Sequence, residues 1–64
     1  MLIEGILERA RQHGVKYLYI HVEARNTAAE ILYKSHGFVL EKEEDEATEV
    51  RLSRPRRKLL LRRL

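Results

Sequence analysis

Apolar side chains recur along the 64 residues with two different periods. Near the N-terminus five of them have helical spacing: Leu2, Ile3, Ile6, Leu7 and Ala10. They predict an amphipathic helix that begins at Leu2 and ends before Gly14. Residues 15–22 are rich in β-branched and aromatic side chains and predict a strand. Neither face of this strand is strongly polar, so we expect both faces to be covered.

A second helix is predicted from Thr27, whose hydroxyl would form a capping box with Glu30, to a glycine stop at Gly37. Residues 38–43 predict a strand, 44–48 a polar turn and 49–53 a second strand, so these two strands would form a hairpin. Residues 56–64 fit a short amphipathic helix, with Pro55 at its first position.

The predicted order is helix, strand, helix, strand, strand, which indicates an α/β (α+β) fold. The strand–helix–strand unit implies a crossover to a roughly parallel strand, and the hairpin's return strand could lie between the two. The first helix would need an earlier strand beside it. We therefore expect the chain to be the C-terminal part of a larger domain.

Composition narrows the class of protein. The chain has no cysteine, which excludes disulfides and thiolate zinc sites and is typical of a cytoplasmic protein. Hydrophobic residues make up 44% and charged residues 36%, which argues against a disordered chain. No apolar run is long enough for a membrane-spanning helix, and no signal-peptide pattern opens the chain.

Basic and acidic side chains are distributed unevenly along the chain. Residues 1–50 carry six basic and ten acidic side chains, whereas residues 51–64 carry seven basic and none acidic. We therefore divide the chain into a domain over 1–54 and a basic tail over 55–64. Such a tail could bind nucleic acid or an anionic membrane surface. The favoured interpretation is a solvated end that complements the acidic turn, because aromatic residues are not interleaved with the basic ones.

One sequence motif indicates a chemical function. Asn26, Ala29, Leu32, Tyr33, Gly37 and Phe38 match the pattern N-x-x-A-x-x-L-Y-x-x-x-G-F. The chain thereby resembles the C-terminal half of the GNAT (GCN5-related) N-acetyltransferases over residues 1–54. The resemblance implies an acetyl-CoA site beside the strand over 15–22. Asn26 would contact the cofactor's pantetheine, and Ala28 and Ala29 would let the cofactor approach the helix start.

By the same resemblance, Tyr33 would be catalytic. It would lie near the thioester sulfur and protonate the departing CoA thiolate, a step that an acid with a pKa of about 10 can perform. The attacking group would be an amine. In an unrelated domain Tyr33 would simply pack between helix and sheet, and Asn26 would be a plain helix cap.

The sequence departs from the family pattern in a feature that is needed for cofactor binding. The 64 residues contain no [Q/R]-x-x-G-x-[G/A] loop, whose amides would bind the cofactor's pyrophosphate. We expect the chain to act as an N-acetyltransferase only when another chain or a second copy completes the fold. A homodimer with a shared sheet is one such arrangement, because the strand over 15–22 would otherwise have an unpaired edge.

The alternative function is a non-catalytic GNAT remnant or interaction module, which would self-associate or bind a partner or nucleic acid through the basic tail. Glu23, where a strand ends, could act as a base, but a solvated carboxylate is the favoured interpretation. The three histidines, His13, His21 and His36, lie on different elements and lack the spacing of metal ligands, so no metal site is expected.

Overall fold

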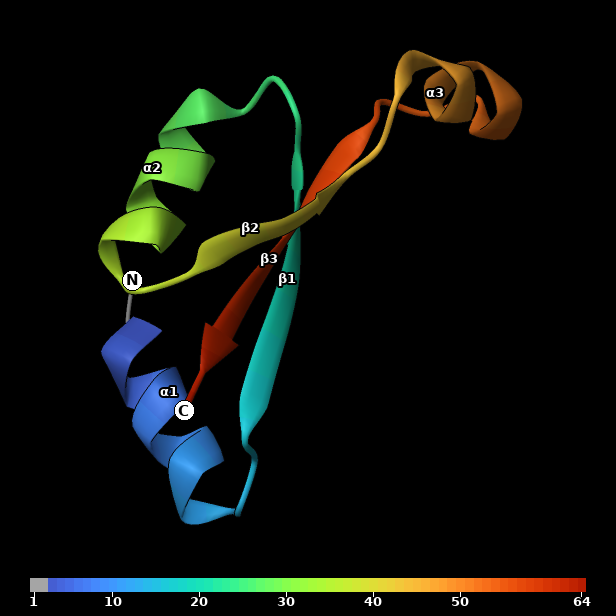
Figure 1. Cartoon of the computed structure of the whole chain (residues 1–64). Helices are drawn as coiled ribbons and strands as arrows, with labels where there is room; N and C mark the ends of the chain where they lie inside the picture. Colours follow the sequence, from blue (N-terminus) through green and yellow to red (C-terminus); the bar gives the residue numbers. More distant parts are fainter. Residues whose placement is uncertain (1–2) are drawn as a thin grey trace.

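A computed structural model describes residues 3–64 of the chain as three helices and three strands (Figure 1). The elements follow in the order α1 (Ile3–Gln12), β1 (Tyr17–Glu23), α2 (Thr27–Ser35), β2 (Val39–Glu43), α3 (Glu46–Leu52) and β3 (Arg57–Arg63). The mixed α+β class is thus confirmed. The predicted helix start at Leu2 lies outside the described residues.

The three strands form one sheet in the order β1-β3-β2. β3 pairs antiparallel with both neighbours, so β1 and β2 run parallel to each other. The crossover through α2 and the placement of a return strand between β1 and β2 were both predicted. The pairing of β2 with β3 contains one irregularity between Leu40 and Lys42.

The position of the return strand was predicted wrongly. Residues 46–52, expected as a turn followed by a strand, form helix α3. Asp45 explains this helix, because its carboxylate accepts hydrogen bonds from the backbone N–H of Thr48 at 2.8 Å and from its hydroxyl at 2.9 Å. These bonds satisfy one of the amide groups left free in a helix's first turn.

The conformation of the last ten residues also differs from the prediction. The segment expected as a basic tail with a short helix forms β3, the central strand. Leucine and arginine are good helix formers, but here the strand supplies hydrogen-bond partners to both β1 and β2, and this tertiary pairing decides the conformation. Leu60, at the middle of β3, is fully buried.

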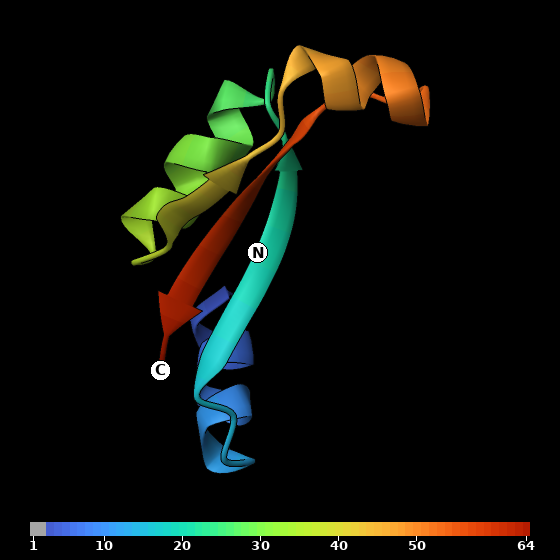
Figure 2. The same cartoon turned by 45° about the vertical axis from the view of Figure 1, so that its right-hand side comes forward.

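The core lies on one face of the sheet. Figure 2 shows α1 and α2 on the same side of the strands, with α3 projecting beyond one end. Five residues form the buried core: Ile3, Leu7, Val22, Phe38 and Leu60. The opposite face, with Tyr17 at 47% and Tyr19 at 57% exposure, has no such cover within residues 3–64. The expectation that both faces of β1 are covered is therefore not met.

The two glycine stops were predicted correctly. Gly14 has a φ of 78° after α1 and Gly37 a φ of 87° after α2. Within residues 3–64, no helix is long and apolar enough to cross a membrane.

Candidate functional site

An apolar pocket of about 180 Å³ lies between α1, α2 and the middle of β1. It is lined by Ile3, Ile6, Leu7, Leu18, Tyr19, Ile20, Tyr33 and Phe38. α1 supplies three of these residues and β1 another three, so three consecutive elements close around one space. We call this the inner pocket, because the helices cover this face of the sheet.

Tyr33, the tyrosine of the sequence motif, lines the inner pocket. It lies in the second turn of α2 and is half-buried against the core. Its ring packs edge-on against Phe38, with ring centroids 5.7 Å apart and an angle of 73° between the planes. This geometry is typical of aromatic pairs, and it fixes the orientation of the tyrosine ring beside the inner pocket.

The inner pocket adjoins an open strand edge. β1 pairs with β3 on one side, and its other edge has no strand beside it within the described residues. The middle of β1, which lines the pocket, therefore has unpaired backbone groups along that edge. Such an edge can pair with another strand.

Asn26 caps α2. Its side-chain oxygen accepts a hydrogen bond from the backbone N–H of Ala29 at 3.1 Å, and its carbonyl accepts one from Glu30. The capping box predicted for Thr27 and Glu30 is therefore wrong: the cap lies one residue earlier, at Asn26, because Thr27 is already the first residue of the helix. The cap leaves the amide nitrogen of Asn26 free for another partner.

The two small residues at the start of α2 differ in their surroundings. Ala28 is exposed, whereas Ala29 is half-buried and packs against the core. The helix therefore presents only Ala28 to whatever lies outside it. Of the four residues assigned to the site, Tyr33 lines the inner pocket, and Asn26 and Ala28 lie at the other end of α2.

Glu30 has a structural role instead of a capping one. It pairs with Lys34 at 2.8 Å along the helix and with Lys58 of β3 at 2.8 Å. Hydrogen bonds, first from Lys34 and then from Lys58, hold the pKa of this carboxyl below its usual range. The pair with Lys58 ties α2 to the central strand.

Glu44 is a second carboxylate with several partners, and these partners lie just before β3 and at its start. Glu44 accepts two hydrogen bonds from the guanidinium of Arg54, at 2.8 and 2.9 Å, and a third from the backbone N–H of Arg57 at 2.8 Å. The pairing with Arg54 is the main reason that the pKa of Glu44 falls to about 2. Two cations of the expected tail are also paired with carboxylates of the same chain, Arg57 with Glu44 at 3.8 Å and Lys58 with Glu30 at 2.8 Å.

The other candidate residues lie apart from the inner pocket. Glu23 is exposed at the end of β1, opposite Arg57 in the sheet register. His36 pairs with Glu4 through its Nδ1 at 2.8 Å and so joins α2 to α1. Residues 3–64 contain no group of three or more His, Asp or Glu side chains that could hold a metal ion.

Comparison of the chain with known proteins identifies one family. The model of the acetyltransferase (GNAT) family matches residues 1–38, which is more than half of the chain. The chain belongs to this family. No curated protein and no solved structure matches the chain significantly.

The family match covers α1, β1 and α2, which are the three elements around the inner pocket. The motif identified Tyr33, but the sequence did not indicate that Ile6 lines the same pocket. The signal in the sequence is the place of Ile6 on the apolar face of the first helix; in the structure this side chain remains 59% exposed.

Proposed function

We propose that this GNAT chain contributes one side of an acetyl-CoA site and transfers acetyl groups to an amine once the domain is completed. The observation that supports this most directly is the position of Tyr33, whose ring lines the apolar inner pocket beside the open edge of β1. An acetyl-pantetheine chain is long, narrow and largely apolar, and it could lie along such a strand edge. The unpaired backbone groups of β1 would then bind its amides.

Tyr33 acts as the acid in this proposal. When the amine attacks the thioester carbonyl, the carbon–sulfur bond breaks and the thiolate of CoA leaves. Tyr33 donates its phenolic proton to that sulfur, the attacking amine releases one proton to water, and Tyr33 takes up a proton from water after the reaction. The edge-on contact with Phe38 holds the ring in place for this role. Asn26 is proposed to contact the pantetheine through its amide nitrogen, beside the exposed methyl group of Ala28.

The phosphates of the cofactor need a separate site, since the 64 residues contain no glycine-rich pyrophosphate loop. We propose that another segment or a second copy pairs with the open edge of β1 and supplies the missing contacts. Completion by a second copy predicts a dimeric mass in solution. Binding through a complementing chain predicts a monomeric mass and weak cofactor affinity.

An acetyl-transfer assay tests the proposal. CoA release from acetyl-CoA is followed with a thiol reagent in the presence of a panel of amines, at chain concentrations high enough for self-association. Tyr33→Phe is expected to lower kcat and leave the KM for acetyl-CoA nearly unchanged. Tyr17→Phe is the matched control, because Tyr17 lies on the opposite face of the sheet, away from the inner pocket. Equal rates for the two variants would refute the role of Tyr33.

The alternative of a nucleic-acid-binding tail has less support. Residues 57–63 form the central strand, and Arg54 and Lys58 pair with Glu44 and Glu30 at 2.8 Å. Cations that are bound in this way release no counterions on meeting a phosphate backbone unless those pairs break. Binding of nucleic acid that falls steeply with salt would nevertheless revive this alternative.

A further inference from the structure

The face of the sheet that α1 and α2 leave uncovered carries a patch of apolar side chains. Leu59 and Leu61 of β3 lie along its middle, and the register places Tyr19 and Val39 on either side of Leu61. Tyr17 lies two residues before Tyr19 and therefore on the same face. The three residues of β1 and β2 are exposed, and the two leucines are half-buried. We call these five residues the outer patch, and a contiguous exposed apolar patch of this kind marks an interaction surface.

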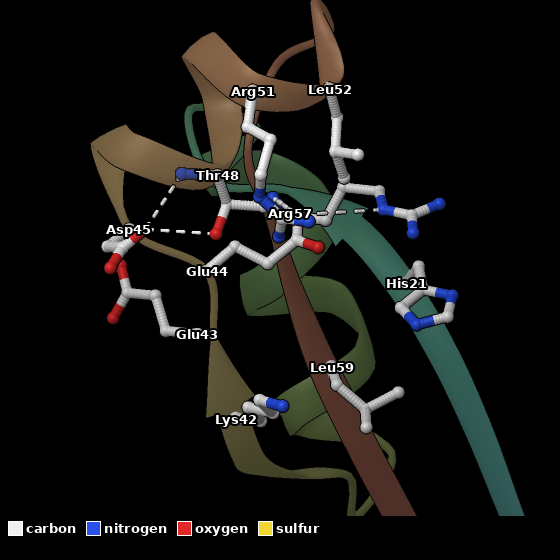
Figure 3. Close-up of a pocket in the computed structure, with 10 residues that line it drawn as sticks. All are labelled: His21, Lys42, Glu43, Glu44, Asp45, Thr48, Arg51, Leu52, Arg57 and Leu59. Atoms are coloured by element: carbon white, nitrogen blue, oxygen red, sulfur yellow. Dashed lines mark hydrogen bonds and ion pairs between the residues drawn. The ribbon is translucent and has the colours of Figure 1, made fainter.

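Helix α3 forms a wall at one end of this face. A hollow of about 380 Å³ lies between α3 and the strands, and Figure 3 shows Leu52 of the helix above His21 and Leu59 of the strands. Leu52 is itself 43% exposed. Tyr17 lies at the opposite end of the face, about 13 Å from His21 along β1. The face thus has a hollow with an apolar wall at one end and an exposed tyrosine at the other.

The charges around the hollow are balanced. Carboxylates and cations line it in equal number: Glu43, Glu44, Asp45, Lys42, Arg51 and Arg57. Because neither sign is in excess, this lining does not select a partner of one charge, such as a nucleic acid or an anionic membrane. A tyrosine fits it better, since the ring packs against leucine and the hydroxyl both donates and accepts hydrogen bonds. The chain itself offers such a residue in Tyr17, at the open end of the same face.

From this arrangement we infer that the outer patch binds the outer patch of a second copy of the chain, turned end for end, so that Tyr17 of each copy enters the hollow of the other. A two-fold axis between the copies fills both hollows at once and places the apolar patches against each other. The two sheets then pack face to face, about 10 Å apart. This contact leaves the open edge of β1 free, so it is separate from the strand pairing proposed above and does not depend on acetyl transfer.

Analytical ultracentrifugation of the 64-residue chain tests this contact. The face, about 14 by 23 Å, is smaller than a standard interface, so the mass is measured over a wide range of concentrations and is expected to rise from that of one chain towards that of two. Tyr17→Lys and Leu52→Lys are each expected to weaken association about tenfold or more. Ile31→Lys is the matched control, because Ile31 is 63% exposed on α2, on the other side of the sheet. A monomeric mass at every concentration, or equal association of all three variants, would overturn the inference.

A second measurement uses the unaltered chain and so does not depend on the folding of any variant. Isotope-labelled and unlabelled copies are mixed, and nuclear Overhauser contacts between the two kinds of copy are recorded. We expect a contact between the ring of Tyr17 and the methyl groups of Leu52. These side chains lie at opposite ends of the face within one chain, so the contact must join two copies.

Amide hydrogen exchange separates this dimer from one that pairs at the β1 edge. Pairing at the edge would protect the amides of β1 that point away from β3, whereas the contact between outer patches leaves them exposed to solvent. A dimer that protects these amides, tolerates Tyr17→Lys and Leu52→Lys, and lacks the contact between Tyr17 and Leu52 would show that the outer patch is not the interface.

Discussion

Replacing Leu60 by alanine tests whether the C-terminal segment is the central strand. Leu60 has 0% exposure and lies between β1 and β2 beneath the helices. Truncating a fully buried leucine costs about 2–5 kcal/mol, the larger values where the surroundings do not collapse into the cavity. A chain of 64 residues is expected to have a total stability of about 3–10 kcal/mol. Leu60→Ala should therefore remove a large share of the folding free energy.

Urea denaturation followed by circular dichroism measures this loss. With a slope of about 1 kcal/mol per molar urea, typical of a small domain, a loss of about 3 kcal/mol lowers the midpoint by about 3 M. Val50→Ala is the control, because Val50 on α3 is 79% exposed and its truncation should change stability by less than about 0.5 kcal/mol. Equal midpoints for the two variants would mean that residues 57–63 are a solvated tail and that the sheet is wrong.

Three further predictions concern turns, caps and pH. Gly37→Ala should destabilise more than Gly14→Ala in the same denaturation assay. The positive φ costs about 1–2 kcal/mol at both positions. Only at Gly37 would the added Cβ meet another side chain, the terminal nitrogen of Arg62 at 2.7 Å, and displace the hydrogen bond that this nitrogen donates to the carbonyl of His36; equal losses would contradict this contact. Asn26→Ala should lower stability by about 1 kcal/mol through loss of the α2 cap, and an unchanged urea midpoint would speak against that cap. The pKa of Glu44 is lowered to about 2 from 4.5, so its stabilisation is complete above about pH 4.5 and is lost as the pH falls towards 2. Melting temperatures between pH 2 and 6 should therefore drop less steeply for Glu44→Gln, and parallel profiles would refute this ion-pair network.

The sequence predicted the elements whose signals are local. Glycines with positive φ end α1 and α2 at Gly14 and Gly37, and the β-branched and aromatic run of residues 17–23 forms β1. The cap at Asp45 was also a local signal for α3, but the acidic run around it favoured a turn. In each case a few neighbouring residues contain the information.

β3 could not be predicted in the same way. Leu59, Leu60 and Leu61 between arginines and lysine are equally compatible with a helix, and the strand forms because β1 and β2 both lack a partner between them. The inner pocket has the same origin. The motif indicated Tyr33, but only the packing of α1 against β1 brings Ile6 and Leu18 to the same pocket.

Binding of acetyl-pantetheine and acetyl-CoA, mapped by backbone amide shifts on the 64-residue chain, tests the proposed site most directly. Because the chain contains no pyrophosphate loop, both compounds are expected to bind weakly and about equally. Their shifts should coincide at Ile6, Ile20 and Tyr33 around the inner pocket. Absence of shifts at high concentrations of both compounds, or shifts confined to the opposite face of the sheet, would contradict an acetyl-CoA site at Tyr33.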